Sequence, residues 1–503
     1  MKKTLLIFSL TILSQTTLKA QPVNGIIYAD TANITVVKVW GTHYERGYAC
    51  GFLLHSGIRA LYEGYLVPKF GTYLPVAKSI IQQGVHISID QKFVDEAQGM
   101  LDGITAAGEY LAGVDYLDML VANSYLDLQG FTSKELGLSH GCSSLLSWGG
   151  ATLNTELYGR SVISRHLDWE PDTAIVNNQV IVVHFPSEPD EQPWLLIGFA
   201  GQMSVLSGLN NAGVCAFQNM MSDFYGSPDY YMGYEPIWFS IRKGMETYDF
   251  NGDNYNDTYD IRDALAANTN GYADGYIVEA LAPSIAGEDS LVAIIAELAA
   301  QDPLIVFRGN EYADSIPGDN LYAANYEIKR NDHRHYCSRY YGVIGAIGNG
   351  KGIGAEENWA IMRDHSNSSW SNIQFMQVVP EDRILRIAVH DGITAAFLLD
   401  SVEFSLDELF DMPTGTGRTN SRNISTVTVF PHPVSDKATI AIHNVNMPAA
   451  FTLYDINGRT ADEITNIRSD RFEFDRKGLP SGVYFFRINN SSGDYGTNKL
   501  LLY

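Results

Sequence analysis

Apolar residues recur at helical spacing in the first part of the chain. A spacing of three or four residues places apolar side chains on one face of an amphipathic helix, here at Phe93, Ala97, Leu101 and Ile104. A second helical stretch is expected over residues 116–126, and a short strand over 35–40 comes before both. Residues 21–141 are therefore predicted to be mostly helical.

After residue 141 the period changes. Short apolar runs separated by Gly, Asn and Pro are typical of strands, and they occur at 161–164, 180–185, 194–199 and 214–217. Helices are expected next, over 238–247, 261–268 and 291–300, and then a hairpin over 375–379 and 384–389. This order predicts an α+β protein in which helices lie outside stacked sheets.

The end of the chain reads as a separate all-β unit. Residues 412–425 are rich in Gly, Thr, Ser and Asn and hold almost no apolar residue, so a linker is expected there, followed by a domain over 426–503. The landmarks of this domain are Phe430-Pro431-His432-Pro433, 453–459, 479–487 and Lys499-Leu500-Leu501. They resemble the C-terminal sorting domain of the type IX secretion system, which implies contact with that machinery and then attachment to the cell surface or release. The alternative is an unrelated β-sandwich that binds a surface glycan.

The beginning of the chain resembles a secretory signal peptide. Lys2 and Lys3 precede an apolar run over 5–13, which is too short to span a bilayer, so residues 1–20 are expected to be removed on export. No other segment is long and apolar enough for a transmembrane span. The net charge of −24 argues against nucleic acid and anionic membranes as partners.

Candidate chemistry centres on Cys142, which follows Gly141. If the peptide bond between them is cut, Cys142 gains an α-amino group with a pKa of ~7.7–8.0, and this amine can deprotonate the thiol. Gly141 offers little steric hindrance at such a bond. The alternative is that Cys142 is half of a disulfide or a small core residue. If Cys142 is the nucleophile, the three remaining cysteines allow at most one bridge.

Charged and amide side chains follow Cys142 at strand-like positions. Arg165 and Asp168 are three residues apart, so on a regular strand they point to opposite faces, but at a strand end or bulge both can reach Cys142. Arg165 is then expected to lower the pKa of the thiol, and Asp168 to hold the α-amino group. Alternatively, the pair marks a solvated strand end. Asn219 is a candidate oxyanion donor, whereas residues 210 and 211 are interpreted as turn residues.

Together these motifs resemble the linear-amide N-terminal-nucleophile (Ntn) hydrolases. This group contains the choloylglycine hydrolases, the penicillin V acylases and the isopenicillin N acyltransferase-like autoproteolytic family, and the stretch over 41–51 resembles the last of these. The resemblance implies an αββα fold, a pro-segment over 21–141 that stays bound after self-cleavage, and a catalytic core over 142–411. It implies a site made of Cys142, Arg165, Asp168, Asn219, Asn325 and Arg339. The family usually has Asn where His166 stands.

The implied reaction has two stages. Cys142 first attacks the carbonyl of Gly141 and frees its own amino group. The thiolate then cleaves an N-acyl amide through an acyl-thioester, and this chemistry needs no metal or cofactor. A bile-acid conjugate, a penicillin-like amide, an N-acyl amino acid or a lipid amide fits the description. Acyl transfer to a second amine and a surface binding protein without turnover are the alternatives; papain-like catalysis is disfavoured because His140 lies too close to Cys142 in sequence.

A second motif predicts a structural calcium ion. Oxygen-bearing side chains stand at positions 1, 3, 5, 9 and 12 of a loop that resembles an EF-hand loop, and position 7 offers a backbone carbonyl. The six residues are Asp249, Asn251, Asp253, Tyr255, Asp257 and Asp260. Position 6 is Asn254 instead of Gly, and Asn tolerates the left-handed conformation needed there. The alternative is an acidic surface loop.

Overall fold

The computed structural model describes two compact units, which divide between Pro413 and Thr414. The described residues are 21–129, 131, 141–221, 228–284, 292–312, 314, 316–330, 337–366, 370–413, 427–430, 434–442, 448–455, 459–469, 471–490 and 493–503. The expected signal peptide, most of the expected linker and the motif residues 431–433 lie outside them.

Two β-sheets form the centre of the first unit. The nine-stranded sheet has the order β1-β2-β5-β6-β7-β8-β9-β10-β11, and the six-stranded sheet has the order β12-β3-β4-β13-β14-β15. The strands of the first sheet are β1 Gly25–Thr31, β2 Ile34–Gly41, β5 Gln179–Pro186, β6 Trp194–Phe199, β7 Ser207–Asn210, β8 Cys215–Met220, β9 Tyr276–Leu281, β10 Ala293–Leu298 and β11 Ile305–Arg308. Those of the second are β12 Asn320–Ala323, β3 Ser143–Ser147, β4 Val162–Asp168, β13 Asn372–Val379, β14 Ile384–Val389 and β15 Val402–Ser405.

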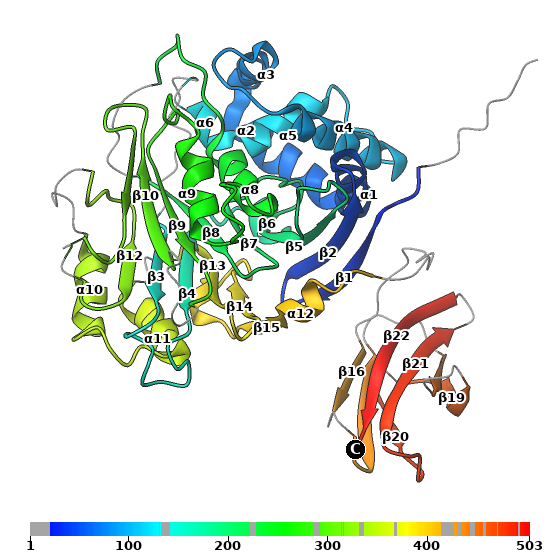
Figure 1. The fold of residues 1–503 in the computed structure, drawn as a ribbon. Helices are drawn as coiled ribbons and strands as arrows, with labels where there is room; N and C mark the ends of the chain where they lie inside the picture. The colour runs from blue at the N-terminus through cyan, green and yellow to red at the C-terminus, as the bar shows by residue number, and fades with distance from the viewer. Residues whose placement is uncertain are drawn as a thin grey trace, which may run out of the picture. The chain divides into compact units, whose positions relative to one another are not determined.

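Helices cover the outer faces of both sheets. The longer helices on the nine-stranded sheet are α1 His43–Leu61, α3 Leu74–Gln83, α4 Gln91–Ala106, α5 Tyr116–Asn123, α8 Ile237–Glu246 and α9 Thr258–Ala266. α10 Ser338–Ile347 and α11 Ala355–His365 lie on the six-stranded sheet (Figure 1). The short helices are α2 Val67–Phe70, α6 Tyr125–Gln129, α7 Thr173–Val176 and α12 Leu406–Leu409, and a π-helical turn spans Tyr62–Leu66.

Three hydrophobic cores confirm the predicted αββα layers. On β5, Val180 and Val182 pack with the first helix layer, whereas Ile181 and Val183 pack between the two sheets. On β13, Phe375 packs with the second helix layer. Because both faces of these strands are buried, they read as continuous apolar runs instead of alternating ones. This is why the sequence located β5 and β6 within one residue.

The segment before Cys142 is an integral part of this unit. Besides its helices it supplies β1 and β2, and β2 pairs in parallel with β5 over its whole length. The sequence placed β2 correctly but missed β1, where small and polar residues interrupt the apolar pattern. A cut at residue 141 therefore leaves two chains that share one sheet and one core.

Glycines allow the backbones of α1 and α4 to touch. A Cβ atom added at Gly51 would overlap the backbone carbonyl of Met100, and one added at Gly47 would overlap that of Glu96. Gly99 and Gly103 on α4 face α1 in the same way. The glycine-rich stretch over 41–51 thus has a packing role, because only glycine permits so close an approach.

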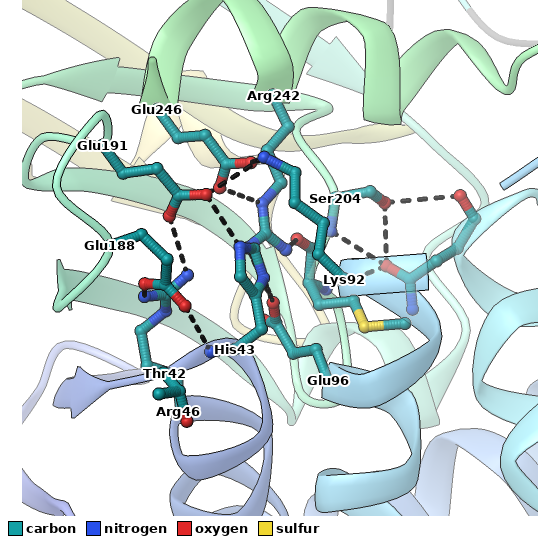
Figure 2. Close-up of polar contacts among 12 residues, drawn as sticks. Thr42, His43, Arg46, Lys92, Glu96, Glu188, Glu191, Ser204, Arg242 and Glu246 are labelled. Atoms are coloured by element: carbon teal, nitrogen blue, oxygen red, sulfur yellow. Dashed lines mark hydrogen bonds and ion pairs between the residues drawn. The ribbon is translucent and has the colours of Figure 1, made fainter. Parts of the chain in front are cut away.

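A buried ion network also joins the two sides of residue 141 (Figure 2). It contains four carboxylates and three permanent cations with one histidine between them: Glu96, Glu188, Glu191, Glu246, Arg46, Lys92, Arg242 and His43. Burial opposes protonation of His43, but hydrogen bonds to Glu191 and Glu96 outweigh it and raise the pKa of His43. A protonated His43 balances the charge of the network, which removes the cost of leaving a buried carboxylate unpaired.

One predicted helix is wrong. The sequence indicated a helix over 291–300, but residues 293–298 form β10, which pairs with β9 and β11. Along β10, Ile294 and Ala296 face the helix layer, whereas Ala293 and Ile295 face the other sheet. A short apolar run of Ala, Ile, Glu and Leu suits a helix by propensity, and periodicity alone does not distinguish it from a central strand.

The second unit is all-β, as predicted. One sheet contains β16 Val427–Phe430, β17 Lys437–Ile442 and β20 Arg471–Asp475, and the other contains β18 Ala449–Tyr454, β19 Thr460–Ile467, β21 Gly482–Asn490 and β22 Gly493–Leu502. Its own core includes Ile440, Phe451, Phe474 and Phe486. Across the described residues of both units, none of the helices has the length and apolar content that a membrane span requires.

Candidate active site

Cys142 lies just before β3, deep in the first unit. Its side chain is 3% exposed. β3 pairs with β4 so that Ser143 is opposite His166, and this register brings Cys142 to the end of β4. The backbone N–H of Asp168 donates a hydrogen bond to the sulfur. The end of β4 therefore forms one wall of the site.

Asp168 is the last residue of β4, and the partner strand β13 has a β-bulge at this point. The bulge lies between Asn372 and Gln374 of β13, opposite the end of β4. Arg165 Nη2 lies 3.9 Å from Cys142 Sγ, and the guanidinium also donates to the Ser207 hydroxyl and the Gln218 carbonyl. Asp168 thus stands at a strand end, one of the two positions from which residues three apart were expected to reach Cys142.

In the uncut chain Arg165 acts on the pKa of the Cys142 thiol in the predicted direction, but burial has the larger effect. Burial raises the pKa of Cys142 to about 11, although the charge of Arg165 acts in the opposite direction. The sequence shows the nearby guanidinium but not the loss of water around the sulfur. At neutral pH the thiol is therefore protonated, and ionisation requires a group that accepts its proton.

Asp168 is a candidate for that group. Burial raises the pKa of its carboxyl to about 7, against the hydrogen bond from Asn372 and the charges of Arg339 and Arg165. Asn372 Nδ2 donates to Oδ1 over 2.9 Å. Oδ2 is buried and has no hydrogen-bond partner within the part of the chain that the structure describes. One oxygen beside the thiol is thus available to a proton or to an α-ammonium group.

Arg339, near the start of α10, contacts the peptide bond between Gly141 and Cys142. Nη1 donates to the carbonyl oxygen of Gly141 over 2.9 Å and to that of Cys142 over 3.0 Å. Nη2 donates to Asn325 Oδ1 over 2.7 Å. Asn325 and Arg339, both predicted from the sequence, thus lie together, and Arg339 contacts the Gly141 carbonyl. A cation in this position stabilises negative charge that develops on that oxygen.

Asn219 lies at the end of β8, where its amide is already engaged. Nδ2 donates to the carboxylate of Glu279 and to the Ala324 carbonyl, the latter over 3.2 Å. Asn325 Nδ2 in turn donates to the Met220 carbonyl over 2.7 Å. The two asparagines therefore tie the end of β8 to the segment after β12. The oxyanion role of Asn219 stays a prediction, because both hydrogens of this amide have acceptors in the uncut chain.

Sequence reasoning missed Glu279 and Asn372. Both are fully buried within strands and no local motif surrounds them; only the pairing of β9 with β8 and of β13 with β4 brings them to the site. His166, the departure from the family pattern, packs against Phe375, and burial lowers its pKa to about 3. It is therefore neutral at physiological pH.

An apolar pocket has the residue after Asp168 in its wall, although none of the six predicted site residues lines it. Its walls include Tyr65, Trp169, Phe199 and Trp238. Trp169 directly follows Asp168 and donates to the Tyr65 hydroxyl over 2.8 Å. Trp238 donates to the side chain of Gln218, whose carbonyl accepts from Arg165. The pocket draws its walls from both sides of residue 141, so the N-terminal segment helps to build it.

The predicted calcium loop has the expected setting. It lies between α8 and α9, and Asn254 has a φ of 70°, the left-handed conformation proposed for position 6. The Asp249 carboxylate accepts backbone N–H groups from residues 252–254. Asp260 accepts N–H groups from Phe250 and Asp257, and with Asp257 it forms the capping box of α9. Calcium binding stays a prediction, and the acid at position 12 has a capping role in this chain.

One other cluster has the geometry of a metal site. Ligand atoms of His43, Glu191 and Glu246 lie within 4.8 Å of one another, in the part of the chain that the structure describes. However, Lys92 Nζ lies 3.0 Å from Glu191 Oε1 and 2.7 Å from Glu246 Oε1 (Figure 2). The ammonium group supplies the positive charge that a metal would bring, so the cluster is an ion network.

Comparison with known proteins identifies the second unit. A family model, described as the Secretion system C-terminal sorting domain, matches residues 428–502. These residues are a sorting domain. The match confirms the type IX prediction made from the landmarks of the C-terminal unit. The sorting domain points to secretion or attachment at the cell surface through that machinery.

Two curated proteins of Dictyostelium discoideum resemble part of the chain. Protein dcd1B is 26% identical over 214 residues, which are 39% of this chain and 41% of the relative. Protein dcd1A is 22% identical over 211 residues, which are 36% of this chain and 44% of the relative. The chain thus spans less than half the length of these curated relatives.

Part of the chain also resembles solved structures of an amidase, an acylase and a hydrolase. An ortholog of N-acylethanolamine-hydrolyzing acid amidase from Caenorhabditis elegans is 13% identical with a TM-score of 0.29, over 48% of this chain and 93% of that one. Penicillin V acylase from Agrobacterium tumefaciens is 13% identical with a TM-score of 0.35, over 55% and 89%. A mutant conjugated bile acid hydrolase from Clostridium perfringens is 10% identical with a TM-score of 0.31, over 53% and 93%.

Proposed function

We propose that this chain is an exported cysteine Ntn hydrolase that cuts itself before Cys142 and then hydrolyses an N-acyl amide. The observation that supports this most directly is the contact between Arg339 and the Gly141 carbonyl, beside a buried thiol. An ordinary core cysteine has no need of a partly buried cation on the preceding peptide bond. Asp168, with one free carboxylate oxygen, completes a set of thiol, proton acceptor and oxyanion partner.

Self-cleavage begins with transfer of the thiol proton to Asp168. The sulfur attacks the carbonyl carbon of Gly141, and Arg339 stabilises the negative oxygen of the tetrahedral intermediate. The carbon–nitrogen bond then breaks, and the nitrogen of Cys142 takes the proton back from Asp168. The products of this step are an α-amine and a thioester. Water hydrolyses the thioester and leaves a Gly141 carboxylate and a free thiol.

The mature site has a new base. The α-amino group of Cys142 accepts the proton of its own thiol, and the Asp168 carboxylate holds the resulting ammonium. Arg165 stabilises the thiolate, which attacks the amide carbonyl of the substrate. The amine leaves with the proton from the ammonium group, and water resolves the acyl-thioester. The α-amino group takes the proton of that water and returns it to the sulfur as the free acid leaves.

The neighbouring pocket favours a substrate with an apolar acyl group. Its aromatic walls reach the site through Trp169 and Gln218, and burial of an apolar chain there contributes about 25 cal/mol per Å². Because helices of the N-terminal segment line it, the two chains must stay associated after the cut. The shared sheet and the ion network provide for that.

The test is intact mass and N-terminal sequencing of the wild type beside Cys142→Ala. We expect two wild-type fragments, one of which begins at Cys142, and an unsplit variant. Cys215→Ala is the matched control, because Cys215 is also a buried thiol but lies apart from Arg339; it should be cut normally. An uncut wild type, or cleavage in Cys142→Ala, contradicts the proposal and favours a surface binding protein. N-acyl amides of graded chain length, assayed for the free acid, then define the substrate.

A further inference from the structure

Glu279 is a buried acid in the site that the reaction scheme above does not use. It lies on β9, opposite Phe217 of β8, and its side chain is fully buried. Oε1 accepts a hydrogen bond from Asn219, and Oε2 has no partner among the described residues. A buried carboxyl with one unpaired oxygen is costly, so a structural role alone gives no reason to keep it.

A continuous set of contacts runs from Glu279 to the peptide bond before Cys142. Asn219 donates to both Glu279 and the Ala324 carbonyl, which fixes the backbone just before Asn325. Asn325 accepts from Arg339, and Arg339 donates to the Gly141 carbonyl. The links are hydrogen bonds between buried or partly buried groups, apart from the peptide bond that joins Ala324 to Asn325. A shift at Glu279 therefore moves the guanidinium relative to the carbonyl that it must stabilise.

Glu279 also acts on the Cys142 thiol through its charge. The charged groups around its carboxyl are Arg165 of β4 and Arg308 of β11. Burial raises the pKa of Glu279 to about 8, although both arginines act against this shift. A negative charge on Glu279 in turn raises the pKa of the Cys142 thiol. Above about pH 8 the carboxylate therefore opposes formation of the thiolate.

We propose that Glu279 is a positioning residue for the reaction at Cys142, which acts through Asn219 and Asn325 on Arg339. This inference rests on the proposed self-cleavage. The hydrogen bond that Glu279 accepts from Asn219 aligns the guanidinium, and the acid is kept neutral at physiological pH so that it does not repel the thiolate. A glutamine in its place retains the acceptor and never carries the charge.

The test compares self-cleavage rates of full-length Glu279→Ala and Glu279→Gln with the wild type. At pH 7 we expect Glu279→Ala to cut at least tenfold more slowly and Glu279→Gln to cut within twofold of the wild type. Val278→Ala is the matched control, because Val278 is a buried neighbour on the same strand that packs toward the helix layer. It should lower the melting temperature but leave the cleavage rate unchanged.

The pH profile keeps the proposal testable if Glu279→Ala does not fold. At pH 9 Glu279→Gln should cut several-fold faster than the wild type, because only the wild type then carries a charge beside the thiol. Superimposed profiles overturn the proposal, as does a Glu279→Ala variant that cuts at the wild-type rate or no more slowly than Val278→Ala. A wild type that is never cut refutes the proposed function instead, so the two failures are distinguishable.

Discussion

Replacement of Arg339 by methionine tests the proposed stabilisation of the negative oxygen at Gly141. Methionine keeps much of the volume and the apolar stem but removes both donors from the Gly141 carbonyl region. In the uncut chain Nη1 lies 2.9 Å from the oxygen that becomes negative in the tetrahedral intermediate. Loss of one such donor costs ~2.7–4 kcal/mol in other enzymes, which corresponds to ~10²–10³ in rate. We therefore expect Arg339→Met to cut itself 10²–10³ times more slowly, to order of magnitude.

The assay is the time course of the uncut chain, followed by intact mass after purification under denaturing conditions. Arg339→Lys should lose less, about tenfold, because an ammonium group keeps the charge but cannot bridge Asn325 and Gly141 as a planar guanidinium does. Arg386→Met is the control: Arg386 is a half-buried arginine on β14 that bonds Ser401 and Glu356. The reasoning is refuted if a folded Arg339→Met, with a wild-type melting temperature, cuts within twofold of the wild-type rate.

Three further predictions concern stability. Gly51→Ala should lower the free energy of unfolding by ~1–3 kcal/mol, because the added Cβ atom overlaps the Met100 carbonyl. Gly345→Ala on α10 is the control: its Cβ atom meets no other atom, so this variant should be neutral or stabilising. Urea titration of both variants measures the two changes. The free energy of unfolding of the wild type should exceed that of His43→Gln by its full amount below about pH 6.5, where His43 is protonated in both the folded and the unfolded state. This excess should disappear as the pH rises through the raised pKa of His43. An equal excess at pH 6 and pH 9 contradicts the prediction. A calcium chelator should lower the melting temperature without stopping cleavage at Cys142, and an unchanged melting curve excludes a calcium ion in the loop over 249–260.

The sequence alone determined those features that depend on neighbours along the chain. The sorting domain could be predicted from its landmarks, and most strands and helices from their periodicity, because a strand or helix that buries one face or both leaves a local pattern. Cys142, Arg165 and Asp168 could be proposed as a group because they lie on β4 and just before its partner β3, so that a short stretch of sequence carries all three. The stretch over 41–51 stands out in the sequence, but the sequence does not show that Gly47 and Gly51 pack against α4.

The tertiary structure decided what depends on neighbours far apart in the chain. β10 is a strand only because β9 and β11 flank it, and this pairing overrides the helical propensity of its residues. No local motif shows how deeply Cys142 is buried. Burial outweighs the expected effect of Arg165 and raises the pKa of the thiol. Glu279 reaches the site through strand pairing, and Arg339 reaches the Gly141 carbonyl from α10, almost two hundred residues along the chain from it. The sequence thus proposed a nucleophile, whereas the fold determined the environment of that residue, because desolvation and long-range hydrogen bonds arise only when distant segments pack together.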